Sequence, residues 1–155
     1  MNALVEIGGG EFSFCAAHTG LHEDGFEPLH GHTFTVTLRL AGPVDARGMV
    51  ADFGPLKAAL RRAIAPLRRR TLIATAVSEA PVTVDGQRVR FGDVDKHYDL
   101  PAGDVALLPL ANTTTEAIAE HLLSQVCVGV AGLDWIELTL AEAPDVAVTI
   151  RRTLS

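Results

Sequence analysis

The chain has 155 residues, of which 48% are hydrophobic and 21% charged, and its formal net charge is −6. This length and composition predict one globular domain over residues 1–155, and the acidity argues against nucleic acid or an anionic membrane as the main partner. We expect no disulfide framework, because the chain has only two cysteines and they lie far apart in sequence. We also expect a cytoplasmic protein, because we find no signal peptide and no apolar run near the roughly 20 residues that span a membrane.

The first segments of the chain alternate as β-strands do. Residues 3–7 form a short candidate strand, and a glycine-rich break separates it from a second candidate strand over residues 11–18. One face of this second strand carries Phe12, Phe14, Ala16 and His18. Cys15 falls on the opposite face, so we expect it to be a small buried thiol and neither a fourth metal ligand nor a nucleophile.

Three histidines are the most informative residues of the sequence. His30-Gly31-His32 opens a long candidate strand over residues 30–40, and residues two apart in a strand point to the same face. A lone His-x-His pair is more often a surface or hydrogen-bonded pair. If this strand pairs with residues 11–18, however, His18 joins His30 and His32, and three imidazoles with an open fourth position are typical of a catalytic zinc site.

The polar loop between these strands, residues 19–28, contains two glycines and a proline. A loop that ends beside a metal site is a natural place for a catalytic group. Glu27 is such a candidate, whereas His22 is expected to be an ordinary solvated residue.

A helix over residues 53–64 follows, with Asp52 as its N-cap. Its apolar positions recur at helical spacing and are Phe53, Leu56, Leu60 and Ile64. Beyond Pro66 comes the run Arg68-Arg69-Arg70, close to Arg61 and Arg62. Five arginines in an acidic protein are either a solvated face or an anion site, since arginine suits phosphate recognition.

The second half of the chain predicts two hairpins and one more helix. An Asp85-Gly86 turn joins two strands within residues 81–91, and another hairpin joins residues 135–142 to residues 146–151. A helix capped by threonine or asparagine begins near residue 115 and runs to about residue 126. His121 within it is expected to be a surface or packing residue. Together the segments indicate an α+β fold, with helices packed on an antiparallel sheet.

Five separated blocks occur in one order and spacing: Phe14-Cys15-Ala16-Ala17-His18, Leu29-His30-Gly31-His32, residues 48–53, Thr114-Thr115-Glu116, and Glu142 at a strand end. Together they resemble the 6-pyruvoyl-tetrahydropterin synthase and 6-carboxy-tetrahydropterin synthase family. The resemblance implies a tunnelling fold (T-fold), in which an antiparallel sheet with two helices on one face assembles into an oligomeric barrel. It also implies a homo-oligomer, specifically a hexamer of two stacked trimers with active sites at subunit interfaces.

The same resemblance implies site residues and a cofactor. His18, His30 and His32 would hold Zn²⁺, and Glu142 would anchor the ring of a small pterin substrate through hydrogen bonds to its aminopyrimidine edge. By the same resemblance, the motif residues Thr114, Thr115 and Glu116 would belong to the same substrate-binding pocket.

Two positions depart from the family pattern. The usual catalytic cysteine, four residues before His30, is replaced by Phe26, and Glu27 follows one residue later. Relatives with glutamate in this region resemble a branch that cleaves the substrate side chain, in which a carboxylate near zinc can serve as general base. The usual Asp-His pair is replaced by Arg68-Arg69, and arginine is a poor proton shuttle because it stays charged.

Three functions follow as hypotheses. The first is zinc-dependent cleavage of 7,8-dihydroneopterin, or its triphosphate, to the folate precursor 6-hydroxymethyl-7,8-dihydropterin, with Glu27 as base. The second is a 6-carboxy- or 6-pyruvoyl-tetrahydropterin synthase, the former on the route to deazapurines such as queuosine. The third is a pterin- or purine-binding protein without catalysis, which the replacement by Arg68 and Arg69 motivates.

Overall fold

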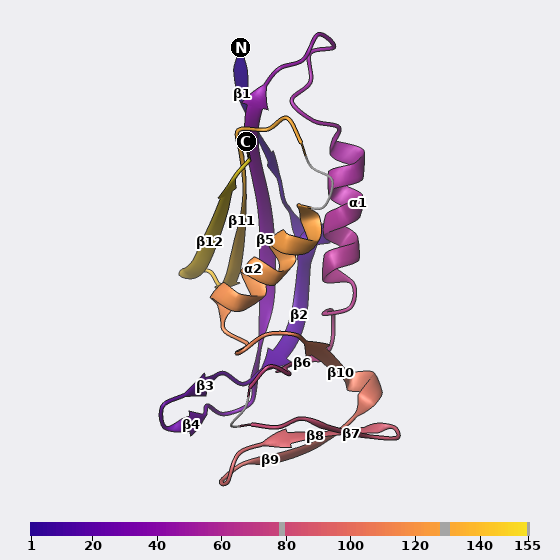
Figure 1. Cartoon of the computed structure of the whole chain (residues 1–155), viewed down its shortest axis with the longest axis vertical. Coiled ribbons are helices and arrows are strands. Elements are labelled where there is room, and N and C mark those ends of the chain that lie inside the picture. Colours follow the sequence, from indigo (N-terminus) through magenta and orange to yellow (C-terminus); the bar gives the residue numbers. More distant parts are fainter. Residues whose placement is uncertain (78–79, 128–130, 155) are drawn as a thin grey trace.

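In the computed structural model, which describes residues 1–77, 80–127 and 131–154, a seven-stranded sheet carries two helices (Figure 1). The sheet order is β10-β6-β2-β5-β11-β12, and β1 also pairs with β5. The strands of this sheet are β1 (Asn2–Ile7), β2 (Ser13–His18), β5 (His30–Pro43), β6 (Thr71–Ala74), β10 (Val105–Leu108), β11 (Trp135–Ala143) and β12 (Val146–Thr153). The helices are α1 (Phe53–Ile64) and α2 (Thr115–Val126), with short 3-10 turns at Gly10–Phe12 and Ala102–Asp104.

The long strand β5 organises the sheet. Along one edge it pairs first with β2 and then with β1, both antiparallel, and along the other edge it pairs antiparallel with β11. The α+β T-fold prediction is confirmed, with one refinement: β6 runs parallel to both β2 and β10, so the sheet is mostly rather than wholly antiparallel.

Both helices cover the same face of the sheet, where the core lies. Alternate residues of β5 supply fully buried side chains to it, namely Phe34, Val36, Leu38 and Leu40. Helix α2 packs against β11 and β12, and α1 packs against α2. Both helices begin as predicted, because Asp52 accepts a hydrogen bond from the amide of Gly54 and Thr114 accepts one from that of Ala117. Each such cap stabilises its helix by about 1 kcal/mol.

The opposite face of the sheet is open, and this corrects one prediction. Cys15 lies on the face away from His18, as the alternation indicated, but its side chain is exposed and not buried. The reason is that both helices lie on the other face, so a residue pointing away from them reaches solvent. Phe53, at the start of α1, is also 47% exposed, unlike the other apolar positions of that helix.

Two smaller sheets lie beside the end of the main sheet where β2 ends and β5 begins (Figure 1). The predicted loop of residues 19–28 contains a small hairpin, β3 (Leu21–His22) and β4 (Gly25–Phe26). A three-stranded sheet is formed by β7 (Thr83–Asp85), β8 (Arg88–Gly92) and β9 (His97–Pro101). Its first turn is centred on Gly86-Gln87, one residue later than predicted, because Asp85 pairs with Arg88. In the described ranges, no helix has the length and apolarity needed to cross a membrane.

Candidate functional site

The pairing of β2 with β5 brings the three histidines together. His18 lies opposite His30 in the antiparallel register, and His32 lies two residues further along the same face. The ring centroids are 4.7 Å apart for His18 and His30, 4.8 Å for His30 and His32, and 5.3 Å for His18 and His32. One ring nitrogen from each lies within 4.8 Å of the others. The predicted convergence is therefore present.

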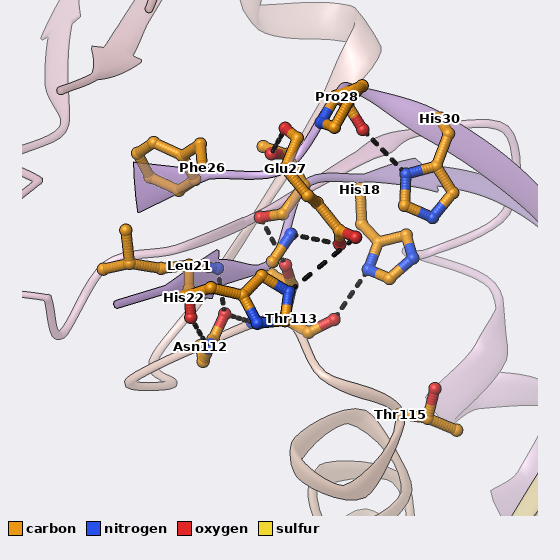
Figure 2. Close-up of polar contacts among 12 residues, drawn as sticks. His18, Leu21, His22, Phe26, Glu27, Pro28, His30, Asn112, Thr113 and Thr115 are labelled. Atoms are coloured by element: carbon orange, nitrogen blue, oxygen red, sulfur yellow. Dashed lines mark hydrogen bonds and ion pairs between the residues drawn. The ribbon is translucent and has the colours of Figure 1, made fainter. Parts of the chain in front are cut away.

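Backbone carbonyls fix the orientation of two of these rings (Figure 2). Nδ1 of His18 lies 2.7 Å from the carbonyl oxygen of Thr113, and Nδ1 of His30 lies 2.8 Å from that of Pro28. A carbonyl only accepts, so each Nδ1 carries the proton and donates, and each Nε2 is free to bind a metal. Such hydrogen bonds are the usual outer support of metal-binding histidines.

His18 shows the clearest fit to a metal ion. It is only 4% exposed, and its Nε2 is the buried side-chain nitrogen or oxygen that lacks a hydrogen-bond partner among the described residues. Burial lowers the pKa of His18, with smaller opposing and supporting effects from its neighbours, so the imidazole is favoured in the neutral form that binds metals. An orphaned, buried imidazole nitrogen beside two further histidines suits Zn²⁺.

Glu27 reaches the histidine cluster from the loop after β4 (Figure 2). One carboxylate oxygen, Oε1, accepts a hydrogen bond of 2.7 Å from the amide of Gly20, and the other, Oε2, lies 3.8 Å from Nε2 of His22. The negative charge of Glu27 raises the pKa of His18, which partly offsets the effect of burial. His22 is exposed as expected, yet it contacts the candidate base, a role that the sequence analysis did not assign.

Glycine is required at position 20 for this arrangement. A Cβ atom there would lie 2.7 Å from Oε1 of Glu27, far inside the distance of an ordinary contact. Backbone bonds close the same loop, since the amide of Glu27 donates to the carbonyl of Gly20 at 3.0 Å and the hydroxyl of Thr19 donates to the carbonyl of Glu27 at 2.6 Å. The carboxylate is thus held on a short, hydrogen-bonded loop.

Distant segments clamp this loop from outside. The side chain of Asn112 accepts from the amide of Leu21 and donates to its carbonyl, at 2.9 and 2.8 Å. Asp93 accepts from the amide of Phe26 at 3.1 Å, and Lys96 donates to the carbonyl of the same residue. Three backbone amides hold the pKa of Asp93 below its usual range, that of Phe26 being the strongest cause. Sequence reasoning missed these residues because they lie 67 to 91 positions away from the loop.

The predicted pterin-binding residues are only partly brought together. The hydroxyl of the buried Thr115 donates to Oε2 of Glu142, so these two residues form one unit. Glu142 lines an open cavity of about 570 Å³ that also borders His32. Thr114 instead uses its hydroxyl as the cap of α2, and Glu116 is exposed in the first turn; neither borders that cavity.

The three arginines that follow Leu67 have different surroundings. The guanidinium of Arg68 donates to the backbone carbonyl of Glu11, whose carboxylate pairs with Arg61. Arg69 and Arg70 instead border a cavity that His32 also lines.

Known proteins share both the sequence pattern and the fold. Residues 9–153 match the family model described as 6-pyruvoyl tetrahydropterin synthase. A candidate 6-carboxy-5,6,7,8-tetrahydropterin synthase of Methanocaldococcus jannaschii is 24% identical over 137 residues, 83% of each chain. One of Pyrococcus abyssi is 30% identical over 98 residues, which cover 63% of this chain and 57% of that protein.

Solved structures give the same similarity. The crystal structure of 6-pyruvoyl tetrahydropterin synthase from Plasmodium vivax superposes with a TM-score of 0.93 at 25% identity, over 99% of each chain. A catalytic-residue variant of that enzyme, in which a glutamate is replaced by alanine, superposes with a TM-score of 0.92 at 24% identity, again over 99% of each chain.

Proposed function

Because the chain belongs to the 6-pyruvoyl tetrahydropterin synthase family, we propose that it is a zinc-dependent lyase acting on a dihydropterin with a hydroxylated side chain. The observation that carries this proposal is that three histidines converge on one face of the β2–β5 pair and that the carboxylate of Glu27 lies near them. A metal-binding triad with one adjacent acid/base group is the minimum equipment for proton abstraction from a metal-activated alcohol.

In this proposal each residue has a separate task. His18, His30 and His32 would hold zinc, which supplies a Lewis acid that polarises a substrate oxygen. Glu27 takes the proton from a side-chain hydroxyl through Oε2, the oxygen that does not accept the hydrogen bond from the Gly20 amide. Glu142, oriented by Thr115, accepts hydrogen bonds from the N–H groups of the pterin ring.

The relatives favour one of the three sequence-based hypotheses. Two are named as candidate 6-carboxy-tetrahydropterin synthases, and the structural neighbour at 25% identity is a 6-pyruvoyl tetrahydropterin synthase. These names support the second hypothesis, a 6-carboxy- or 6-pyruvoyl-tetrahydropterin synthase, better than they support side-chain cleavage. We therefore place the synthase reaction first.

One observation keeps side-chain cleavage as the second candidate. The acid/base group beside the histidines is a carboxylate, whereas Cys15 points to the other face of the sheet and Cys127 lies at the end of α2. No thiol of the described ranges therefore serves the cluster, and a carboxylate base suits a retro-aldol cleavage that gives 6-hydroxymethyl-7,8-dihydropterin. A glutamate is also the catalytic residue replaced in the Plasmodium vivax variant.

We also propose that the protein works as a homo-oligomer, a hexamer by resemblance to its family. The open face of the sheet, with exposed Cys15, Thr33 and Thr35, supports an assembly that encloses it. Light scattering coupled to size-exclusion chromatography tests this directly: a mass near six times 16.4 kDa is expected, and a monomer would contradict it.

The decisive experiment for the reaction is product identification. The zinc-loaded protein is incubated with dihydroneopterin triphosphate, and the products are separated by mass. A 6-pyruvoyl or 6-carboxy product supports the synthase, 6-hydroxymethyl-7,8-dihydropterin supports cleavage, and tight pterin binding without turnover establishes the non-catalytic hypothesis instead.

A pair of variants tests the role of Glu27. Glu27→Gln removes the base and should lower kcat by roughly 10²-fold or more, with zinc content unchanged. Glu23→Gln makes the same chemical change on an exposed side chain of the same loop and should retain full activity. Equal activity of the two variants would remove Glu27 from the mechanism.

A further inference from the structure

A short segment between β10 and α2 contacts both parts of the candidate site, the histidines and the loop of Glu27. Asn112 and Thr113 lie in this segment, and each makes hydrogen bonds to residues 19–28, here called the Glu27 loop. Thr113 also faces His18 through its carbonyl oxygen (Figure 2). Neither Asn112 nor Thr113 borders the two cavities that His32 lines. Any effect of these two residues on a ligand in those cavities is therefore exerted through other residues.

Asn112 holds the outer part of the Glu27 loop. Its Oδ1 accepts hydrogen bonds from the amide of Leu21 at 2.9 Å and from the amide of Thr113 at 2.8 Å, and its Nδ2 donates to the carbonyl of Leu21 at 2.8 Å. Both backbone donors meet Oδ1 and the backbone acceptor meets Nδ2, so the side-chain amide has one favoured orientation. These bonds tie the start of the β3–β4 hairpin to the segment before α2.

Thr113 holds the inner part of the same loop. Its hydroxyl donates to the carbonyl of Thr19 at 3.1 Å, and the hydroxyl of Thr19 donates in turn to the carbonyl of Glu27 at 2.6 Å. Both threonines are buried, so water does not compete for these two bonds. Two shielded hydroxyl groups thus connect Thr113 to the backbone of the candidate base.

Thr113 has a second contact, to the candidate metal ligand His18. Its carbonyl oxygen accepts the hydrogen bond from Nδ1 of that ring at 2.7 Å, while its amide is held by Asn112. The peptide groups on both sides of Thr113 are therefore fixed, and the orientation of the His18 ring depends on them. Loss of such an outer partner typically lowers the metal affinity or the activity of a site by 10- to 100-fold.

The segment is anchored at both ends, which suits a fixed support. Before it, the amide of Ala76 donates to the carbonyl of Leu110 at 3.0 Å, beyond the paired residues of β6 and β10. After it, the hydroxyl of Thr114 caps the first turn of α2. Polar groups that are held by rigid elements can keep a neighbouring loop in the geometry that a reaction needs.

We propose that Asn112 and Thr113 are positioning residues that fix the Glu27 carboxylate relative to the His18 ring. The inference rests on the proposed function, because it concerns the base and a metal ligand of that reaction. The base and this ligand come from different segments, the Glu27 loop and β2, and Thr113 contacts both. A base must lie within hydrogen-bond reach of the proton that it takes, and a misplacement of 1 Å costs roughly 10²-fold in rate.

Hydrogen exchange tests this support without any turnover. The amides of Leu21 and Glu27 are followed by NMR in the zinc-loaded wild type, in Asn112→Ala and in Thr113→Val. In Asn112→Ala the Leu21 amide loses its acceptor and should exchange roughly tenfold faster. In Thr113→Val the Glu27 amide should also exchange roughly tenfold faster, because the bond to Thr19 no longer holds the loop. Wild-type exchange of the Leu21 amide in the first variant, or of the Glu27 amide in the second, would overturn the proposal.

Zinc affinity tests the contact with His18. It is measured by competition with a chelator for the wild type and for Asn112→Ala. The variant should bind zinc roughly tenfold more weakly, because the Thr113 amide loses its partner and the carbonyl behind His18 is no longer held in place. Equal zinc affinity of the two proteins would overturn the part of the proposal that concerns the metal ligand.

A matched set of threonine variants separates positioning from general stability. Thr113→Val removes the hydroxyl at nearly constant size, whereas Thr113→Ser retains it. Thr75→Val removes a similar bond outside the site, since the hydroxyl of Thr75 donates to the carbonyl of Leu108 at 3.0 Å. With dihydroneopterin triphosphate as substrate, Thr113→Val should lower kcat by roughly tenfold or more with little change in KM. Thr113→Ser and Thr75→Val should keep the wild-type kcat.

Two results of this comparison would overturn the proposal. An equal loss of kcat in Thr75→Val and Thr113→Val would show that lost stability explains both. A kcat that Thr113→Ser does not restore would show that the hydroxyl is not the cause. Absence of turnover in every protein, the wild type included, contradicts the proposed function alone, because amide exchange and zinc affinity are measured independently of turnover.

Discussion

Replacing Gly20 by alanine would displace the candidate base without altering it. The new Cβ would lie 2.7 Å from Oε1 of Glu27 and 3.4 Å from Nε2 of His22. The oxygen must withdraw by about 0.7 Å, the difference between 2.7 Å and the 3.4 Å at which ordinary contact begins. This movement weakens the 2.7 Å hydrogen bond from the Gly20 amide. Because the obstructing atom is the end of a flexible side chain, the fold should tolerate the change.

The effect on catalysis should be large compared with the effect on stability. A misplacement of a catalytic group by 1 Å costs roughly 10²-fold in rate, so a shift of this size should lower kcat by about 10- to 100-fold. Zinc content should be unchanged, since the nearest neighbours of the added Cβ belong to Glu27 and His22 and not to the three histidines. Steady-state turnover and metal analysis on the same preparation measure both.

A matched glycine-to-alanine variant elsewhere shows whether the loss of activity comes from displacing the Glu27 carboxylate or from removing a glycine as such. A Cβ at Gly10 would meet nothing within 4 Å, and the residue has no positive φ, so Gly10→Ala should be fully active. If both Gly20→Ala and Gly10→Ala keep the wild-type kcat, the position of the Glu27 carboxylate does not govern the reaction.

Three further predictions concern the supports of the site. Thr115→Val removes the donor to Glu142 and should raise KM for the pterin by roughly tenfold with little change in kcat; an unaltered KM would contradict the role of that pair. Asp93→Ala removes the acceptor for the Phe26 amide, so this amide should exchange its hydrogen faster and kcat should fall; unchanged exchange would show that the clamp is not needed. Burial lowers the pKa of His18 in the folded chain below its ordinary value of 6.5. Between the folded and the unfolded pKa, the unfolded chain binds more protons than the folded chain, so stability rises with pH. The melting temperature of the metal-free protein should therefore fall as pH drops below about 6.5, and less so in His18→Asn; equal pH dependence would refute this.

The histidine cluster could be predicted from sequence because its geometry is local. A period of two in the strand puts His30 and His32 on one face, and an antiparallel neighbour needs only a short loop to bring His18 alongside. The helix starts at Asp52 and Thr114 were predictable for the same reason, since a cap acts within three residues.

The surroundings of Glu27 could not be predicted, because they depend on contacts between distant segments. Asn112 and Asp93 clamp its loop from 91 and 67 residues away, and no periodic pattern links such positions. The prediction of a buried Cys15 was wrong for a different reason. Alternation assigns a residue to one face of a sheet, but it does not say whether other elements cover that face. The four-residue strand β6 was also too short for a periodicity argument.

The claim that three histidines hold a catalytic zinc ion is tested most directly by metal stoichiometry. Zinc is measured after equilibration with a competing chelator for the wild type, His32→Gln and His121→Gln, the last being a histidine of α2 outside the cluster. One zinc per chain is expected for the wild type and for His121→Gln, with a strong loss in His32→Gln. Equal zinc binding by all three proteins would contradict the assignment of the metal site and, with it, the proposed mechanism.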